Sequence, residues 1–267
     1  MERERTCEPP ILPAALAERI AGRAWSRDTV GEAGCAVWRL HRPGAADYYL
    51  KQGDGARTAD ILDEATRLRW LAGRLPVPAV RHLTVDGDAA WLLTDAIAGP
   101  TAWQALDARP GRRGEVVDAL ADFLRRIHAL PVDRCPFEAG HALRLAHARD
   151  RLEAGEIDES DFGEDHAGWS AARLWEEITT LLPFDAGRVV THGDYSLDNI
   201  VMAEGGVAGC LDVGRLGVAD PHQDVAILWE CLGEFDAELR ERFLARIGIA
   251  AVNERRLRFH LMLDECF

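Results

Sequence analysis

The chain has 267 residues and an apolar fraction of 48%, which is enough for one large domain or two packed lobes. Its formal net charge of −14 argues against DNA, RNA or an anionic membrane as a partner, because proteins that bind such partners usually carry a basic stripe. The acidic balance fits a cationic ligand, although many cytosolic proteins are acidic for solubility alone.

Nothing in the sequence indicates export or membrane insertion. The first five residues are polar and are soon followed by prolines, so no secretory signal is expected. No stretch approaches the roughly 18 uninterrupted apolar residues of a membrane span. The six cysteines are scattered, without a C-x-x-C pair or zinc-ligand spacing. These features favour a cytoplasmic protein with reduced thiols.

The first third of the chain mixes strand and helix patterns. The β-like runs 35–41 and 47–51 flank a Pro43-Gly44 turn and predict a hairpin. Residues 58–73 then have helical periodicity, with Ile61, Ala65, Leu68 and Ala72 on one face. Thr58 or Asp60 is expected to cap this helix. Two further β-like runs lie near 77–85 and 89–94.

The Ala98-Gly99-Pro100 segment breaks the pattern, and the chain beyond it is mostly helical. The sequence therefore predicts two lobes, residues 1–97 and 98–267. Helices are expected near 115–130, 141–154, 169–182, 221–233, 236–247 and 253–265. Short β-like runs at 189–191, 200–202 and 207–211 interrupt this helical part and enclose polar loops. Loops held between buried strands are where catalytic groups tend to lie.

One polar loop carries the residue types that phosphoryl transfer requires. The segment from His192 to Asn199 reads HGDYSLDN, and Asp212 follows a short hairpin. Mg²⁺ prefers oxygen ligands, which an amide and a carboxylate supply, and a separate carboxylate must accept the proton of the attacking hydroxyl. Asp194, Asn199 and Asp212 provide this set, although Asp and Asn are also common turn formers. For His192 a structural role, tying down the loop, is expected rather than proton transfer.

The segment is similar to the catalytic loop of the protein-kinase-like fold, in the variant shared by aminoglycoside, choline and homoserine kinases. The resemblance implies an α+β fold with a small β-rich N-terminal lobe that binds nucleotide and a larger, mainly helical C-terminal lobe that holds catalytic and substrate-binding residues. It further implies ATP and Mg²⁺ as cofactors, Asp194 as the catalytic base, and Asn199 and Asp212 as metal ligands. Asp212-Val213-Gly214 stands where protein kinases carry D-F-G.

Such a kinase also needs a strand lysine for the phosphates and a helical glutamate to pair with it. Lys51 ends a β-like run, and Glu64 lies on the polar side of the next helix. The alternative to an ion pair with Lys51 is that Glu64 is a solvated surface charge. Residues 31–34, Gly-Glu-Ala-Gly, are the candidate phosphate-covering loop. Adenine is expected to bind backbone groups near Asp95 to Ile97.

Three further segments resemble the aminoglycoside 3′-phosphotransferases: 212–220 running into Gln223-Asp224, Cys135-Pro136-Phe137, and the final residues 263–267. Aminoglycosides carry several ammonium groups, so their pocket should contain carboxylates that make charge-assisted hydrogen bonds. By this resemblance, the substrate-binding residues are expected to be Glu164, Asp194, Arg215, Glu234, Asp264, Glu265 and Phe267. The sequence departs from relatives at Glu230-Cys231, where some carry an Arg-Asp pair, and at Cys266, where an aromatic residue is frequent.

The resemblance implies an ATP-dependent phosphotransferase that modifies an aminoglycoside hydroxyl, the 3′ position above all, and so confers antibiotic resistance. A monomer or weak dimer without nucleic-acid or membrane partners is expected. The nearest alternative is another small-molecule kinase of the same fold, acting on a macrolide, choline or homoserine. A non-catalytic pseudokinase would lack Lys51, Asp194, Asn199 or Asp212, and all four are present.

Overall fold

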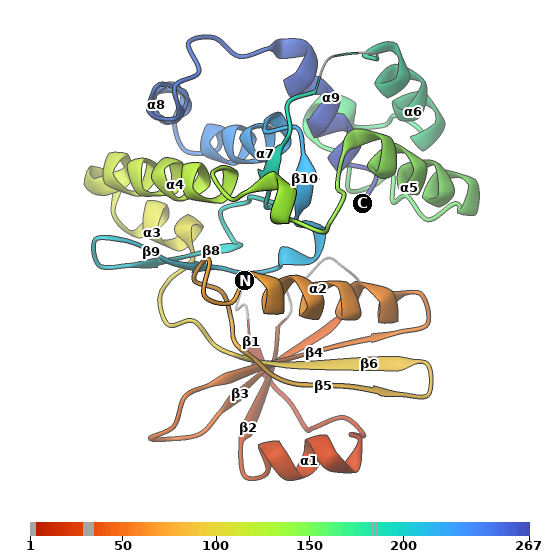
Figure 1. Ribbon diagram of the computed structural model, residues 1–267, viewed down its shortest axis with the longest axis vertical. Coiled ribbons are helices and arrows are strands. Elements are labelled where there is room, and N and C mark those ends of the chain that lie inside the picture. The colour runs from red at the N-terminus through yellow and green to blue at the C-terminus, as the bar shows by residue number, and fades with distance from the viewer. Residues whose placement is uncertain (1–3, 29–34, 183, 185) are drawn as a thin grey trace. The chain divides into compact units, whose positions relative to one another are not determined.

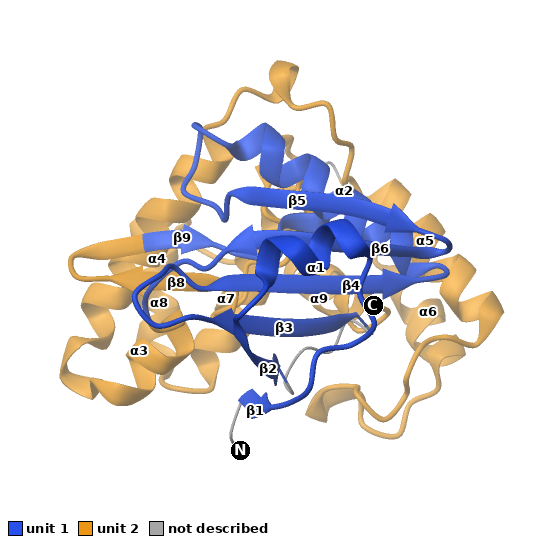
Figure 2. Ribbon diagram, turned by 90° about the horizontal axis from the view of Figure 1, so that it is seen from below, with its two compact units in different colours: residues 1–99, 208–214 blue, residues 100–207, 215–267 orange. Residues whose placement is uncertain are grey.

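The computed structural model describes residues 4–28, 35–182, 184 and 186–267 and divides into two compact units (Figure 2). Unit 1 comprises Met1–Gly99 and Ala208–Gly214, and unit 2 comprises Pro100–Val207 and Arg215–Phe267. Asp212 therefore belongs to unit 1, although it lies far along the chain. The segment 31–34, expected to cover phosphates, lies outside the described residues. Within the described part of the chain, every helix is too short or too polar to cross a membrane.

Unit 1 is built on a six-stranded sheet in which all neighbouring strands are antiparallel, in the order β1-β2-β3-β4-β6-β5. Its strands are β1 (Glu4–Thr6), β2 (Ala24–Asp28), β3 (Ala36–His41), β4 (Tyr48–Asp54), β5 (Val80–Asp86) and β6 (Ala89–Asp95). Its helices are α1 (Ala14–Ile20) and α2 (Arg57–Leu71). Figure 1 shows α2, in orange, along one face of this sheet and α1, in red, on the other.

The alternation of side chains along β4 explains why the two helices cover opposite faces. Successive residues of a strand point to opposite faces of the sheet. Leu50, paired with Leu93, packs with Leu16 of α1 in one buried cluster that also holds Trp38. Its neighbour Lys51 consequently points to the other face, where α2 lies. The fold thereby places Lys51, the one cation of β4, beneath the helix in which Ile61, Ala65 and Leu68 are buried, whereas Ala72 lies past the helix end and is exposed.

The structure adds elements to unit 1 that the sequence analysis does not predict, and it corrects one expectation. The described residues 4–28 form β1, α1 and β2, and β1 is stabilised by pairing with β2 rather than by its own three residues. Neither Thr58 nor Asp60 caps α2, since the helix already begins at Arg57 and has no side-chain cap. Thr58 donates its hydroxyl instead to the carbonyl of Gly53 at 3.4 Å.

Unit 2 is mainly helical, with two small antiparallel strand pairs, β7–β10 and β8–β9. Its helices are α3 (Ala102–Ala108), α4 (Arg113–His128), α5 (His141–Ala154), α6 (Ala171–Thr180), α7 (His222–Gly233), α8 (Ala237–Ile247) and α9 (Glu254–Asp264). Its strands are β7 (Val189–Thr191), β8 (Ile200–Ala203), β9 (Gly206–Cys210), which runs across the boundary of the two units, and β10 (Gly217–Ala219).

The end of α9 is firmly anchored within unit 2. Phe259, Met262 and Leu263 of α9 are fully buried in one cluster with Leu174 and Ile178 of α6. Burial of such side chains stabilises a domain by roughly 1.5–3 kcal/mol each. The residues that follow Leu263 therefore start from a fixed backbone position.

The α+β class and the helical content predicted for the second part of the chain are confirmed. One helix, α3, is absent from the sequence-based prediction. Its start is defined by a capping box, in which the Thr101 hydroxyl accepts from the N–H of Gln104 and the Gln104 side chain accepts from the N–H of Thr101. The T-x-x-Q pattern is a readable signal for such a start.

Candidate active site

Lys51, Glu64 and Asp212 form a charged cluster within unit 1. Lys51 Nζ donates to both carboxylate oxygens of Glu64, at 2.9 and 2.8 Å, and lies 3.2 Å from Asp212 Oδ1. Burial alone would lower the pKa of Lys51, but the two carboxylates raise it above its usual range, so the amine stays charged. The cluster provides a fixed ammonium group beside a carboxylate whose side chain remains 47% exposed.

The backbone around Asp212 is held by close packing inside unit 1. The N–H of Cys210 donates to the carbonyl of Pro76 at 3.1 Å. A Cβ on Gly209 would lie 2.7 Å from the backbone carbonyl oxygen of Pro76, which cannot move aside easily, so this approach requires glycine. Asp212 itself has a φ of 52°, the left-handed conformation that L-residues rarely adopt. An unusual backbone at a charged residue is a frequent feature of functional sites.

The residues expected to bind adenine lie at the end of β6. The Asp95 carboxylate accepts two hydrogen bonds of 2.6 Å from Arg81. The N–H of Asp95 donates to the carbonyl of Ala79, and that of Ala96 donates to the carbonyl of Asp47. These two N–H groups are already used, so adenine binding near Asp95 to Ile97 would depend on the other backbone groups of this segment, and it stays a prediction.

Asp194 and Asn199 are brought together on the loop between β7 and β8 in unit 2. Asn199 Nδ2 donates to Asp194 Oδ2 at 2.9 Å and to the Asp194 carbonyl at 3.1 Å. The carboxylate is thereby held by one of its oxygens. Because the amide nitrogen donates to Asp194, the carboxamide oxygen is the atom of Asn199 that could act as a ligand of a cation.

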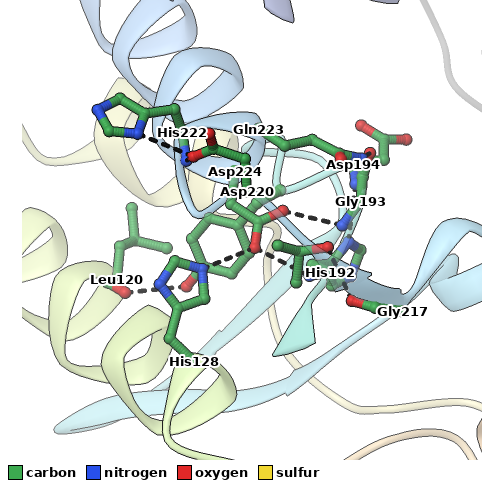
Figure 3. A network of polar contacts seen from close by, with 12 residues as sticks. Leu120, His128, His192, Gly193, Asp194, Gly217, Asp220, His222, Gln223 and Asp224 are labelled. Atoms are coloured by element: carbon green, nitrogen blue, oxygen red, sulfur yellow. Dashed lines mark hydrogen bonds and ion pairs between the residues drawn. The ribbon is translucent and has the colours of Figure 1, made fainter. Parts of the chain in front are cut away.

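A buried carboxylate fixes this loop from behind (Figure 3). Asp224, at the start of α7, accepts hydrogen bonds from the N–H groups of His192 and Gly193 at 2.9 and 2.8 Å, and is 3.0 Å from His128 Nε2. Although burial opposes ionisation, the hydrogen bonds and the nearby histidines lower the pKa of Asp224 below its usual range. Gln223 adds a bond to the Gly193 carbonyl at 3.0 Å.

Gly193 and His192 complete the loop's backbone. Gly193 has a φ of 92°, and a Cβ there would lie 2.3 Å from the Arg215 carbonyl oxygen, so no other residue fits. The His192 ring is buried, and its Nδ1 accepts from the N–H of Asp194 at 3.3 Å. This contact matches the structural role expected for His192. Sequence reasoning assigned no role to His128 and Asp224, which meet across 96 positions.

The acids expected to bind substrate gather around the end of α9. Asp264 Oδ1 accepts from Arg215 at 3.1 Å and from Arg144 at 3.0 Å. Both guanidinium groups lie over the Phe267 ring, at 5.2 and 5.1 Å from its centroid. Glu265 is 2.9 Å from His166 Nδ1, so this acid too has a cationic or hydrogen-bonding partner.

The remaining predicted substrate residues are exposed. Glu164 begins a short 3₁₀ turn, η3 (Glu164–His166), whose last residue contacts Glu265. Glu234 ends α7. Burial raises the pKa of the Cys231 thiol to about 12, and Glu234, Asp194 and Asp264 add to this rise.

The oxygen donors available for a cation are few. Among the described residues there is no group of three or more His, Cys, Asp or Glu side chains arranged to hold a metal ion. The Asp212 carboxylate in unit 1 and the Asn199 carboxamide oxygen in unit 2 are each a hard oxygen donor of the kind that Mg²⁺ prefers. Donors of this type suit Mg²⁺ better than a metal that prefers nitrogen or sulfur ligands.

The chain is similar to known phosphotransferases over nearly its whole length. Residues 31–260 match the model of the Phosphotransferase enzyme family. An aminoglycoside 3′-phosphotransferase of Escherichia coli is 46% identical, with 100% of this chain and 99% of the relative covered. The crystal structure of an aminoglycoside-3′-phosphotransferase of type VIII is 36% identical, with a TM-score of 0.85 and coverage of 95% of this chain and 97% of that one.

A third similarity includes bound ligands. An aminoglycoside phosphotransferase from Streptomyces rimosus, solved in complex with ADP and streptomycin, is 30% identical, with a TM-score of 0.76 and coverage of 89% of this chain and 94% of that one. Together these similarities confirm the resemblance seen in the sequence. They also confirm the fold class, with its β-rich N-terminal part and its mainly helical C-terminal part.

Proposed function

Because the chain belongs to the phosphotransferase enzyme family, we propose that it transfers the γ-phosphoryl group of ATP to a hydroxyl group of an aminoglycoside, with the 3′ hydroxyl as acceptor. The full-length similarity to an aminoglycoside 3′-phosphotransferase supports the acceptor class. The observation that carries the chemistry is the hydrogen bond between Asn199 and Asp194, on a loop held by Asp224. Such a modification inactivates the antibiotic and confers resistance.

Unit 1 supplies the nucleotide-binding residues in this proposal. Lys51 contacts the phosphates and Glu64 keeps it in place, as their 2.8 Å ion pair supports. Ile97 and Asp95 border the adenine. Mg²⁺, which Asn199 and Asp212 would hold, neutralises charge on the phosphates when bound. We propose residues 1–97 as the nucleotide-binding part and 98–267 as the catalytic and substrate-binding part.

Asp194 is the catalytic base. Its carboxylate accepts the proton of the acceptor hydroxyl while the hydroxyl oxygen forms a bond to the γ-phosphorus and the bond from that phosphorus to ADP breaks. Asn199 donates to one carboxylate oxygen of Asp194 at 2.9 Å and so orients the carboxylate that accepts the proton. Catalysis depends chiefly on positioning, because a loosely held base loses much of its effective concentration. The three hydrogen bonds to Asp224 and Gln223 limit the movement of the loop.

The acceptor-binding residues carry the charge that a polycation requires. The carboxylates come from Asp264, Glu265, Glu164 and Glu234. Arg215 donates to Asp264 and so orients it, and the Phe267 ring lies beneath the Arg215 guanidinium group. Charge-assisted hydrogen bonds to ammonium groups are worth about 1.5–3 kcal/mol each. The formal net charge of −14 adds a favourable long-range attraction for such a ligand.

The setting of the enzyme follows from its co-substrate. Transfer from ATP requires a compartment that contains ATP, so we place the enzyme in the cytoplasm. All the residues assigned above belong to one chain, and we propose that a monomer or weak dimer is active without nucleic acid or membrane as a partner.

A coupled ADP-release assay across chemically distinct acceptors tests the proposal. Kanamycin and neomycin should give turnover that depends on Mg²⁺, whereas a 3′-deoxy aminoglycoside should not. Streptomycin, a macrolide, choline and homoserine serve as alternative acceptors. Turnover with a macrolide, choline or homoserine in place of kanamycin would contradict the aminoglycoside assignment, and equal turnover with the 3′-deoxy compound would contradict the position of transfer.

A further inference from the structure

The C-terminal end of α9 carries two acids where negative charge is unfavourable. The last carbonyl groups of a helix give that end a partial negative charge, which disfavours carboxylates in the last turn. Asp264 is the last residue of α9 and Glu265 caps it. Each acid nevertheless has a partner inside unit 2: Asp264 contacts Arg144 and Arg215, and Glu265 contacts His166. These partners stabilise carboxylates that the helix itself would repel.

Arg144 is the most buried of these partners. It lies in the first turn of α5, and its side chain is only 8% exposed. Burial lowers the pKa of Arg144, and the nearby Asp264 carboxylate opposes that effect. A buried guanidinium that loses its counterion is strongly destabilised, so Arg144 and Asp264 constrain each other. An exposed ion pair would hold the carboxylate far less firmly.

Both arginines contact the same oxygen of Asp264. Arg144 Nη2 is 3.0 Å and Arg215 Nη1 is 3.1 Å from Oδ1, and the Phe267 ring lies beneath both guanidinium groups. The Asp264 side chain is still 30% exposed. Two donors on one oxygen fix the rotation of the carboxylate, because a rotated carboxylate would lose both contacts. The orientation of the second oxygen, Oδ2, is then determined as well.

We propose that Arg144 is a positioning residue for acceptor binding: with Arg215 it holds Asp264 Oδ1, so that Oδ2 is presented to an ammonium or hydroxyl donor of the acceptor. This inference rests on the proposed function of Asp264. Arg144 does not touch the acceptor in this scheme. It acts through the carboxylate that does, and it links α5 to α9 across 120 positions of the chain.

Steady-state kinetics of Arg144→Met test this role. The variant removes the charge and the fork of donors but keeps an apolar stem of similar length. We expect the KM for kanamycin to rise about tenfold, with kcat and the KM for ATP within about twofold of the wild type. Arg144→Lys retains the positive charge without the planar guanidinium group and should restore part of the loss. A general loss of folding would instead reduce kcat and alter both KM values.

Arg151→Met is the matched control on the same helix. Arg151 lies seven residues further along α5, and its guanidinium also lies over the Phe267 ring, at 6.0 Å. Its hydrogen bond is to the carbonyl of Glu156 rather than to Asp264. The control should therefore keep the kanamycin KM of the wild type. A rise as large as that of Arg144→Met would assign the effect to packing on Phe267 and overturn the inference.

A double-mutant cycle with Asp264→Asn separates this inference from the proposed function. Asp264→Asn alone should raise the kanamycin KM about tenfold. Adding Arg144→Met should raise the KM little further, because both changes remove the same contact. If Asp264→Asn raises the KM and Arg144→Met does not, the positioning role of Arg144 is overturned while Asp264 stays in the acceptor site. If Asp264→Asn has no effect, the substrate role of Asp264 fails and the inference fails with it.

Discussion

Among single residues, Asp194 is the one on which the proposed reaction depends most. Its carboxylate is held through one oxygen by Asn199, and its backbone N–H donates to His192. Asp194→Asn keeps the shape of the side chain but cannot accept a proton. We expect kcat with kanamycin to fall roughly 10²–10⁴-fold, with ATP affinity by calorimetry unchanged. Asp198→Asn, an exposed change on the same loop, is the control, and near-normal turnover in Asp194→Asn would remove this base from the mechanism.

The residues that touch the reaction were easier to predict from sequence than those that hold them. Asp194, Asn199 and Asp212 stand in a short pattern with chemical meaning, so their types and spacing predict roles for them, and these roles stay predictions. Asp224 and His128 are ordinary helix residues whose meeting depends on how α4 and α7 pack, which no local pattern shows. The same is true of Arg144, which reads as a polar position on α5 until the tertiary fold places Asp264 beside it.

At the scale of elements, the packing of α9 against α7 includes a buried titratable group. His260 of α9 is 2% exposed, and burial together with the nearby charge of Arg144 lowers its pKa to about 3. Asp220 opposes this shift, whereas His222 and His141 add to it. The folded state thus strongly prefers neutral imidazole at this position.

This burial makes stability depend on pH in a defined window. An unfolded histidine has a pKa of about 6.5, so between pH 6.5 and about 3 the unfolded state binds more protons and stability falls as pH falls. From pH 7 to 5 the loss should be about 2 kcal/mol, measurable by urea unfolding. His260→Phe keeps a ring against Phe184 and Phe259 and should flatten this profile.

The exposed His147 on α5 supplies the control for the pH experiment. His147→Gln should leave the pH dependence of the wild type unchanged. If a His260→Phe variant loses as much stability between pH 7 and 5 as the wild type, burial of His260 is not the cause of the pH dependence. The pKa values of Asp224 and Asp220 are lowered in the folded state. Their carboxylates therefore add stability that is fully present above the unfolded pKa near 4 and is lost as the pH falls below that value.

Elements differed in how well sequence predicted them. The segment 115–130, which forms α4 up to His128, has apolar residues at helical spacing, of which Leu120, Phe123 and Ile127 are buried and Val116 and Leu130 are half-buried. By contrast, β1 has three residues and α1 has seven, which is too short for a periodic signal. These elements form because the sheet of unit 1 offers them partners.

At the scale of the whole molecule, each unit carries part of the chemistry. Unit 1 holds the Lys51–Glu64–Asp212 cluster, and unit 2 holds Asp194 and Asn199. The segment Ala208–Gly214 belongs to unit 1 through contacts with Pro76 and Ile97. The sequence pattern does not predict that this segment packs into unit 1, because the packing depends on the close approach of Gly209 to Pro76 rather than on composition. The division of roles at residue 97 stays a prediction.

The central claim is that the chain places a phosphoryl group on the 3′ oxygen of an aminoglycoside. The most direct measurement is the structure of the product formed from kanamycin and ATP, by mass spectrometry and by ³¹P–¹H correlation NMR. The account predicts the addition of one phosphoryl group, with phosphorus coupled to the proton on carbon 3′. An unmodified kanamycin, or a phosphorus coupled to a proton at another position, would contradict it.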